Sequence, residues 1–591
     1  MRQSILIHDP KAGHWLTFEN PVRIVSASSL AEVLPALREI ETEVNQNGLF
    51  AAGFLSYEAA PAFDSALKVR PDDSGFPLLW FGLYHAPQST LASIALATEA
   101  AHPGLHSLGD GGTSWLPTIT REEYETTVAR LRQYLFMGDT YQVNYTFRLR
   151  GPCPTSPETL FHNLVQAQGP HYSAFVDTGD FVLCSASPEL FFRLEGDRLE
   201  SRPMKGTEKR GLTPEDDRNQ AQRLQDSEKN RAENIMIVDM IRNDMGRIAI
   251  PGSVAPERLF EIERYPTVWQ MVSTVTSQTR AALSDIFSAL FPCASITGAP
   301  KPRTMDIIAR EETTPRRIYT GTIGYLAPGR RAQFNIAIRT VLVDRRAGTA
   351  EYGVGGGIVW DSETGNEYEE CWLKAKVLTD SPPMFELLET LLWTPEGGIF
   401  VLDRHLHRLA ESAAYFDIPL SIPDLRSLLN AESSRSTVPL RIRLRVARDG
   451  KITIESTPFD LRGASSPVRV RLAAKPIDPG DRFLYHKTTH RAVYEQAKAG
   501  VADCDDVLLW NPAGELTEST IATIVVERNG EFLTPPVRCG LLPGTYRAEL
   551  LKQGIIREAI LPVSKLTHFD KIHLINSVRK WREAILIPTV P

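Results

Sequence analysis

Charged residues at helical spacing in the stretch 367–374 could bind a metal ion. Glu367, Glu370 and Lys374 are three and four residues apart, so an α-helix would place them on one face. An apolar stretch that opens at Glu233 reads as another helix and would bring a further carboxylate. Mg²⁺ accepts one or two protein carboxylates together with water and substrate oxygens. Taken alone, however, this pattern is more typical of solvated glutamates that form i, i+4 ion pairs.

Three stretches rich in Gly, Thr and Pro interrupt the first half of the chain, at residues 203–207, 295–301 and 353–357. Their small residues let backbone N–H groups approach an anion closely, and Arg339 could add a bidentate clamp on a carboxylate. Each glycine cluster alone is better explained as a turn. Arg339 alone could equally be a surface charge at the end of a strand.

The elements that must position these residues point to an α+β fold. Strand patterns at 181–183 and 190–193 alternate with a helical pattern at 231–241, without a regular βαβ period. From residue 385 the pattern changes to short alternating strands, such as 440–446 and 522–526. No glycine-rich nucleotide motif opens a predicted helix, so a nucleotide site is not indicated.

The length and two breaks in composition predict the domain organisation. A chain of 591 residues exceeds what one hydrophobic core usually supports. The break at 379–383 predicts one domain over 1–380 and a second over 384–591. A weaker Gly- and Ser-rich break at 106–114 separates an N-terminal subregion of about 1–115 from a core of about 120–376.

Composition and charge argue against several classes of protein. With 65 Lys and Arg against 72 Asp and Glu, and no basic stripe, nucleic acid is not expected as a partner. The chain start is too short in apolar residues for a signal peptide, and no stretch approaches the roughly 20 apolar residues of a membrane span, so we expect a cytoplasmic protein. The six cysteines form no CxxC pair and are interpreted as buried apolar residues.

Ordered motifs over about residues 120–376 resemble those of the chorismate-utilising enzymes. Besides the stretches above, they are Gly138–Asn144, Ser187–Phe191, Arg242–Asp244 and Asp361–Ser362. The resemblance implies a large antiparallel β-sandwich with surrounding helices, which binds chorismate. It implies Glu233 and Glu370 as Mg²⁺ ligands with Glu367 supporting them. The residues it places around the substrate are Thr297, Gly298, Tyr319, Arg339, Gly355, Gly356, Gly357 and Lys374.

Lys205 distinguishes branches of this family. Aminodeoxychorismate synthases carry Lys at this position, whereas anthranilate synthases and isochorismate-type enzymes typically carry Ala. The lysine amine can add at ring C2 as the C4 hydroxyl departs, after which ammonia displaces the lysine and arrives at C4. Glu189 would protonate the leaving hydroxyl, while Mg²⁺ would hold the ring carboxylate. Because an unperturbed lysine titrates near about 10.4, we expect Lys205 to be desolvated and uncharged.

Some positions depart from the family pattern or leave alternatives open. Gln270 stands where many relatives have His, so we assign it substrate contact at most. Residues 53–58 are similar to the family's N-terminal region, which in relatives can hold tryptophan. No glutaminase motif of the Gly-x-Cys-x-Gly type occurs, so ammonia must come from solution or from a separate glutamine amidotransferase subunit.

The second half, from about 385 to 582, resembles the class IV pyridoxal-phosphate enzymes. Its matching motifs are residues 403–409, 486–491, 516–520, 542–545 and 576–579. The resemblance implies a two-subdomain α/β fold, and a homodimer is an option because class IV relatives often dimerise. Pyridoxal phosphate needs an amine, a carboxylate for its ring nitrogen and donors for its phosphate. Lys487, Glu518 and Arg408 would fill these roles, and further phosphate contacts would come from Ser519, Thr520, Gly544 and Thr545.

The fusion itself favours one pair of activities. If the first half places an amine at C4 of the chorismate ring, the second half could remove the C4 proton with Lys487 and release pyruvate from C3. The chain would then be a bifunctional enzyme of 4-aminobenzoate synthesis. The alternatives are an anthranilate- or isochorismate-type synthase fused to a class IV aminotransferase, and a non-catalytic module that binds tryptophan or chorismate. Lys205 is the feature against the first alternative.

Overall fold

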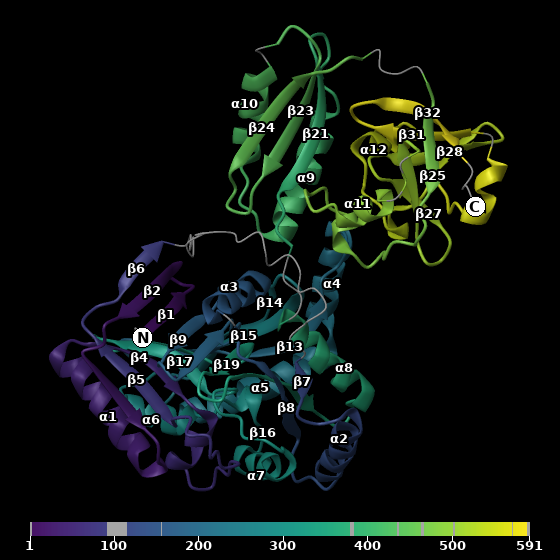
Figure 1. The fold of residues 1–591 in the computed structure, drawn as a ribbon. Helices are drawn as coiled ribbons and strands as arrows, with labels where there is room; N and C mark the ends of the chain where they lie inside the picture. The colour runs from purple at the N-terminus through teal and green to yellow at the C-terminus, as the bar shows by residue number, and fades with distance from the viewer. Residues whose placement is uncertain are drawn as a thin grey trace. The chain divides into compact units, whose positions relative to one another are not determined.

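The computed structural model describes residues 3–91, 115–154, 156–378, 383–433, 436–461, 466–499, 501, 503–569 and 571–587. The chain divides into two compact units, residues 1–210 with 220–382 and residues 211–219 with 383–591 (Figure 1). The composition break at 106–114 lies outside the described residues, as does most of the break at 379–383. Within the described ranges, no helix is long and apolar enough to cross a membrane.

The first unit contains two ten-stranded sheets, in which every pairing is antiparallel. The first sheet has the order β16 (Gly298–Ala299), β8 (Gln142–Pro152), β20 (Thr349–Ile358), β19 (Thr340–Asp344), β10 (Phe181–Ser185), β9 (Ala174–Asp177), β1 (Ser4–Asp9), β2 (His14–Glu19), β6 (Gln88–Leu91), with β7 (Leu116–Pro117) beside β8. The second has the order β13 (Met204–Lys209), β15 (Val268–Gln278), β12 (Arg198–Arg202), β11 (Leu190–Glu195), β18 (Arg331–Asn335), β17 (Thr322–Ala327), β4 (Phe50–Leu55), β5 (Leu79–Tyr84), β3 (Arg23–Ala27), with β14 (Ala255–Arg264) beside β15.

The two sheets share one buried apolar cluster and are covered by helices on their other sides. Ile7 and Leu183 of the first sheet meet Phe54 and Ile323 of the second in that cluster. The helices are α1 (Leu30–Asn47), α2 (Arg121–Phe136), α3 (Pro157–Gln168), α5 (Glu228–Gly246), α6 (Leu283–Leu290), α7 (Lys301–Glu311) and α8 (Thr364–Ala375). A further helix, α4 (Pro214–Asp226), begins in the segment 211–219 that belongs to the second unit. The helices α2, α3 and α8 bury their apolar faces with strands of the first sheet, and α1, α5 and α6 with strands of the second.

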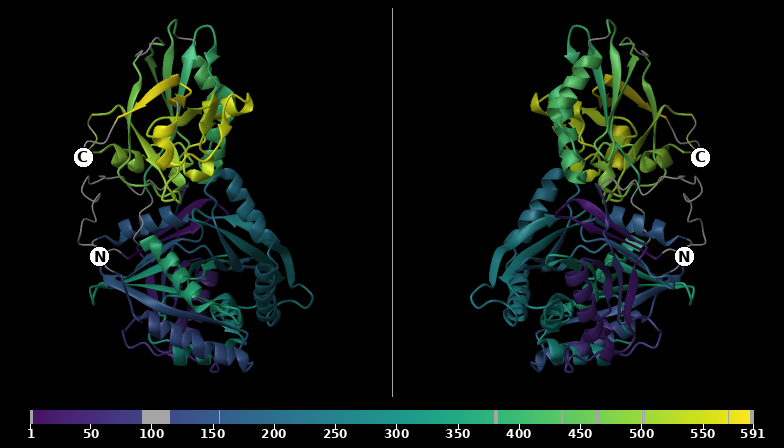
Figure 2. Two further views of the ribbon diagram at one scale, coloured as in Figure 1. Left: turned by 90° about the vertical axis from the view of Figure 1, so that its right-hand side faces the viewer. Right: turned by 90° about the vertical axis from the view of Figure 1, so that its left-hand side faces the viewer.

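The second unit consists of two sheets with their own helices (Figures 1 and 2). A four-stranded antiparallel sheet has the order β22 (Gly398–Ile399), β21 (Leu387–Thr394), β23 (Leu440–Val446), β24 (Ile452–Pro458), and packs on α9 (Leu402–Phe416) and α10 (Ile422–Ser433). An eight-stranded sheet has the order β27 (Leu516–Ser519), β26 (Asp506–Trp510), β25 (Val468–Leu472), β32 (Lys580–Leu586), β31 (Lys571–Asn576), β28 (Thr523–Arg528), β29 (Glu531–Thr534), β30 (Arg557–Glu558), with α11 (Ala492–Lys498) and α12 (Thr545–Lys552).

Predicted strands and one predicted helix can be compared directly with the elements of the structure. The predicted strand 440–446 is β23, and the strands at 181–183 and 190–193 lie within β10 and β11. The predicted helix 231–241 lies within α5. The fold is mixed, with helices around mainly antiparallel sheets; parallel pairings occur in the eight-stranded sheet, between β25 and β26 and between β25 and β32.

Candidate active sites

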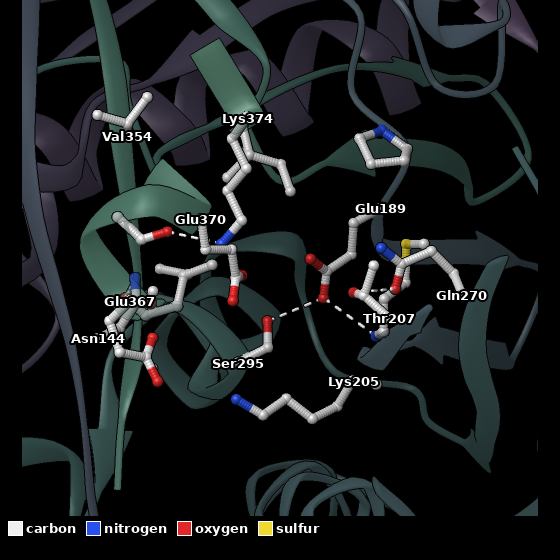
Figure 3. Close-up of a pocket in the computed structure, with 18 of the residues that line it drawn as sticks. Asn144, Glu189, Lys205, Thr207, Gln270, Ser295, Val354, Glu367, Glu370 and Lys374 are labelled. Carbon is white, nitrogen blue, oxygen red and sulfur yellow. Dashed lines mark hydrogen bonds and ion pairs between the residues drawn. The ribbon is translucent and has the colours of Figure 1, made fainter. Parts of the chain in front are cut away.

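A pocket of about 370 Å³ in the first unit collects most of the predicted site residues. Lys205 comes from β13, Glu233 from α5, and the three charged residues of 367–374 from α8. Figure 3 shows Lys205, Glu189, Ser295 and Glu370 directed toward one common space. The predicted residues that line this pocket are Glu189, Lys205, Glu233, Tyr319, Arg339, Gly355, Gly356, Gly357, Glu367, Glu370 and Lys374.

Lys205 is largely withdrawn from solvent inside this pocket. Its side chain is 18% exposed, and its Nζ lies 3.5 Å from Oε2 of Glu233, with which it forms an ion pair. Gly357 leaves room for the amine, because a Cβ atom at that position would lie 2.8 Å from Lys205 Nζ. Lys205 is thus partly buried, with a carboxylate beside its amine.

The helix α8 presents its carboxylates to the pocket at the predicted spacing. Lys374 Nζ lies 2.7 Å from Glu370 Oε1 and donates a hydrogen bond of 2.8 Å to the carbonyl of Gly355. Burial raises the pKa of Glu367, and the neighbouring charge of Glu370 raises it further. Among the described residues no group of three or more His, Cys, Asp or Glu side chains is preassembled as a metal cage. Two carboxylates facing one cavity nevertheless suit Mg²⁺, which takes most of its ligands from water and substrate.

Glu189 has the environment of a proton donor. Its side chain is buried, accepts a hydrogen bond of 2.9 Å from Ser295 Oγ and one of 3.4 Å from the backbone N–H of Met204. Burial raises the pKa of the Glu189 carboxyl to about 7, although the Ser295 hydrogen bond acts in the opposite direction. A carboxyl group with such a pKa is partly protonated near neutral pH and can give up a proton.

Residues predicted to bind a substrate carboxylate lie along β20 and the segment 338–340. Arg339 adopts a left-handed backbone conformation with φ of 52°, and its Nη1 donates to the carbonyl of Lys374 at 2.9 Å. The Tyr319 ring packs against Gly353, where a Cβ atom would lie 2.1 Å from the ring. Burial raises the pKa of Tyr319 to about 12, so its hydroxyl stays protonated as a donor.

Thr297 and Gly298, which are predicted substrate contacts, are not among the residues that line the pocket. Thr297 is fully buried, and its hydroxyl donates to the carbonyl of Cys293 at 3.1 Å. Gly298 has a φ of 150° and pairs with Val143 of β8; a Cβ atom there would lie 2.0 Å from the carbonyl of Gln142. The two residues therefore turn the chain onto the edge of the sheet, and the glycine is required by close backbone packing.

Further residues line the pocket besides the predicted site residues named above. Ser295 stands in a glycine-rich stretch, and the structure makes it the hydrogen-bond donor to Glu189. Asn144 and Lys229 also line the pocket. Gln270 lines it as well and accepts a hydrogen bond of 3.0 Å from Thr207. Asn144 and Ser295 lie in the family-like stretches 138–144 and 295–301, and Gln270 is a predicted substrate contact, whereas Lys229 carries no such signal.

A second pocket, also of about 370 Å³, lies in the second unit and contains Lys487. Burial lowers the pKa of the Lys487 amine to about 8, and the nearby Arg408 guanidinium lowers it further. Glu518 lies in the same pocket, accepts a hydrogen bond of 2.8 Å from Tyr494 and one of 3.2 Å from the backbone N–H of Leu542. Burial raises the pKa of Glu518 to about 7.

The predicted phosphate contacts lie around the start of α12. Gly544 and Thr545 line the pocket at the N-terminus of that helix, a favourable position for an anion. Arg408 also lines the pocket. Its Nε and Nη2 donate to the two oxygens of Glu389 at 2.8 and 2.7 Å, and its Nη1 donates to the carbonyl of Pro543 at 3.1 Å, which leaves one N–H on each terminal nitrogen for a ligand. This set of one amine, one buried carboxylate and several donors fits pyridoxal phosphate.

The hydroxyls of Ser519 and Thr520, which are predicted phosphate contacts, have hydrogen-bond partners within the protein. Ser519 is fully buried outside the pocket lining, and its hydroxyl donates to the carbonyl of Ala522 at 3.1 Å, closing a turn. Thr520 lines the pocket, but its hydroxyl already donates to Asp506 at 2.5 Å. The sequence does not predict the hydrogen bond from Tyr494 to Glu518, because nothing in the pattern of a short helix indicates which distant residue a tyrosine contacts.

Comparison with known proteins assigns both halves of the chain. Residues 2–380 match the family model for chorismate binding enzyme, and residues 386–587 match that for amino-transferase class IV. The anthranilate synthase component I of Streptococcus pneumoniae has a similar solved structure, with a TM-score of 0.53, 26% identity and coverage of 64% of this chain and 92% of that one.

Three curated relatives match the first half. Aminodeoxychorismate synthase component 1 of Salmonella typhimurium is 41% identical over 264 residues, which are 44% of this chain and 58% of that protein. The protein of the same name from Bacillus subtilis is 34% identical over 57% of this chain and 78% of its own length. An anthranilate synthase component 1 of Haloarcula marismortui is 42% identical over 62% and 74%, respectively. The chain therefore belongs to the chorismate binding enzyme family and carries an amino-transferase class IV domain after it.

Proposed function

We propose that this chain makes 4-aminobenzoate in two steps. Residues 1–380 would act as an aminodeoxychorismate synthase that converts chorismate and ammonia to 4-amino-4-deoxychorismate and water. Residues 384–591 would act as a lyase that splits this product into 4-aminobenzoate and pyruvate. The observation that carries the proposal is the amine of Lys205, which lies inside a carboxylate-lined pocket beside Glu233.

In the first site, Lys205 would be the nucleophile. Its amine would add to ring C2 while both ring double bonds shift by one position, from C1=C2 and C5=C6 to C1=C6 and C4=C5, and the C4–O bond breaks; Glu189 would give the leaving hydroxyl its proton. Ammonia would then add at C4, both double bonds would return, and the C2–N bond to Lys205 would break. Water is the net leaving product, so atoms balance. The raised pKa of Glu189, about 7, supports its role as the acid.

The other pocket residues would bind and orient chorismate. Glu233 and Glu370, supported by Glu367, would hold Mg²⁺, which orients the ring carboxylate and competes with Lys205 for Glu233. Arg339, Tyr319 and the backbone of residues 355–357 would bind a carboxylate of the substrate. The two ten-stranded sheets would form the family's β-sandwich around this site, and their shared buried cluster supports that arrangement.

In the second site, Lys487 would move the proton. Pyridoxal phosphate, when bound, supplies an electron sink that makes the proton on substrate C4 acidic. Lys487 would take this proton, and cleavage of the C3–O bond would release pyruvate and leave an aromatic ring. Glu518 would face the cofactor's ring nitrogen, while Arg408 and the Gly544–Thr545 backbone would bind its phosphate. The lowered pKa of Lys487, about 8, suits a proton carrier at neutral pH.

Ammonia would come from a separate glutamine amidotransferase subunit. The relatives' designation as component 1 supports a partner of this kind. The rival function is an anthranilate-type synthase fused to an aminotransferase, and the similarity to the Haloarcula protein is the observation that favours it. Lys205 argues against it, because a lysine nucleophile has no use when the amine arrives at C2.

The proposal is tested by incubating the pyridoxal-phosphate-loaded chain with chorismate, Mg²⁺ and an ammonium salt. Formation of 4-aminobenzoate together with an equal amount of pyruvate is the expected result. Anthranilate as the product would establish the rival function. Release of neither product under conditions in which both cofactors are bound would refute both.

A further inference from the structure

Three arginines stand in a row on β23, on one face of the four-stranded sheet. Arg441, Arg443 and Arg445 alternate with Leu440, Ile442 and Leu444, which are buried in the core against α9 and α10. Since side chains alternate between the faces of a strand, the arginines share the opposite face. Arg443 lies directly across from Thr390 of β21, and Arg441 from Leu392.

The three arginines differ in whether their charge is already compensated. Arg445 binds Glu386 at 3.0 Å and Glu455 at 2.6 Å, and it does not line the pocket of Lys487. Arg441 and Arg443 do line that pocket. Within the part of the chain that the structure describes, neither of their side chains has an ion pair or a hydrogen bond.

The pocket therefore has positive charge beyond what its cofactor would use. Arg408 and Arg547 are paired with Glu389 and Glu558, and Arg491 donates to the carbonyl of Thr520. Arg579 also lines the pocket, and its guanidinium lies 5.6 Å from the ring centroid of Phe459. Glu518 is the acidic side chain of the lining, and it faces the cofactor's ring nitrogen in the proposed function. A phosphate at Arg408 and the start of α12 would leave Arg441 and Arg443 without a counter-ion. Two unpaired guanidinium groups facing one cavity recognise carboxylates well.

We infer that Arg441 and Arg443 bind the carboxylates of a dianionic cyclic amine and so determine the substrate specificity of the second site. This inference rests on the proposed lyase function. The substrate of that reaction carries one carboxylate on its ring and another on its enolpyruvyl group, both remote from the reacting amine. An α-amino acid has a single carboxylate beside its amine and would leave at least one of these arginines unpaired, which disfavours it.

The test uses the full chain loaded with pyridoxal phosphate and compares the double variant R441Q/R443Q with R445Q. Steady-state turnover of supplied 4-amino-4-deoxychorismate to 4-aminobenzoate gives KM and kcat separately. Removing one charge-assisted hydrogen bond to a carboxylate should raise KM by about tenfold, hence about 100-fold for the double variant, with kcat changed less than about threefold. R445Q should keep both constants, and R441K/R443K should recover part of the affinity.

A binding measurement separates this inference from the lyase proposal. The stable dicarboxylate 3-(carboxymethoxy)benzoate and the monocarboxylate 3-methoxybenzoate are titrated against each variant, followed by the visible absorbance of the bound cofactor. The dicarboxylate should bind the unaltered chain at least tenfold more tightly, and R441Q/R443Q should lose that preference. Equal binding of the dicarboxylate to both forms would overturn the inference. If the unaltered chain does not turn over aminodeoxychorismate, the lyase proposal fails. The binding titration with the dicarboxylate then still tests whether Arg441 and Arg443 bind carboxylates.

Discussion

Lys205 and Gly357 are fitted to each other across the first pocket. A Cβ atom on Gly357 would lie 2.8 Å from Lys205 Nζ and 3.1 Å from Nε2 of Gln142. At 2.8 Å the lysine amine would have to move away from the added carbon. Gly357 belongs to β20 and Lys205 to β13, strands of different sheets. Because Gly357 has no side chain, the Lys205 amine from the other sheet can occupy the space beside it.

We therefore expect Gly357→Ala to displace the lysine amine without unfolding the protein. The atom that must move is the end of a flexible side chain, so the free energy of unfolding should change by less than about 1 kcal/mol. Synthase turnover should fall by at least about 100-fold, because misplacing a reacting group by about 1 Å has that effect. The measurement is kcat for ammonia-dependent aminodeoxychorismate formation, alongside the thermal midpoint.

Gly365→Ala provides the matched control. Gly365 lies near the start of α8, with only Arg121 Nη2 at 3.6 Å from a built Cβ atom. Alanine in a helix should stabilise by up to about 1 kcal/mol, with turnover unchanged. Equal turnover of G357A and G365A would contradict the fitted arrangement of Lys205 and Gly357.

The sequence predicts which face of a helix or strand a residue occupies, because that depends only on the spacing of residues along the chain. The i, i+3 and i+7 positions of Glu367, Glu370 and Lys374 put them on one face of α8 wherever that helix packs. Likewise, the alternating pattern of 440–446 predicts the strand β23 and its buried face. Local periodicity suffices for these features because it does not depend on distant partners.

The sequence does not predict which residues or ligands the polar side chains of an element will contact. From the sequence, Arg441 and Arg443 of β23 are indistinguishable from ordinary surface charges, but in the structure they line the same pocket as Lys487 and Glu518. Conversely, Thr297 and Ser519 belong to functional-looking motifs, but their hydroxyls donate to backbone carbonyls. Whether a hydroxyl faces a ligand or closes a turn is decided by tertiary packing, which leaves no local signature.

Lys205→Ala should abolish aminodeoxychorismate formation or divert the product toward anthranilate. Without an amine that adds at C2, ammonia can itself attack that carbon, and the two-step route to C4 is lost. Product analysis by chromatography distinguishes the outcomes. Lys209→Ala, on the exposed end of the same strand, serves as the control and should behave as the unaltered chain. Unchanged product and turnover in K205A would rule out a nucleophilic role for Lys205.

The pH dependence of the synthase step should report Glu189. Burial raises the pKa of this carboxyl to about 7, and only its protonated form can act as the acid. At a fixed concentration of free NH3, kcat should therefore fall about tenfold per pH unit above this pKa. Ser295→Ala removes a hydrogen bond that favours the carboxylate, so the falling limb should move to higher pH. An unmoved limb in S295A would assign the titration to another group.

Removal of divalent cations should stop the first reaction and spare the second. Glu233 and Glu370 belong to the pocket of Lys205, whereas the pocket of Lys487 is lined by a single acidic side chain, Glu518, among the described residues. With a chelator present, chorismate consumption should fall below detection, while supplied aminodeoxychorismate should still yield 4-aminobenzoate. Re-addition of Mg²⁺ should restore the first step in the unaltered chain but only weakly in E233Q/E370Q. Full synthase turnover in excess chelator would exclude the magnesium site.

Lys487→Ala should uncouple the two reactions. Lys487 and Lys205 lie in different compact units and line different pockets, so loss of the former should leave synthase turnover within about twofold, because sites without shared partners act independently. The chain should then accumulate 4-amino-4-deoxychorismate without pyruvate. Borohydride reduction followed by peptide mass spectrometry should find the cofactor fixed on Lys487 in the unaltered chain and on no residue in K487A. Lys475→Ala, an exposed lysine of the same unit, should keep both the labelling and the release of pyruvate. If K487A still released pyruvate at the original rate, proton transfer would have to be assigned to a different group in the pocket.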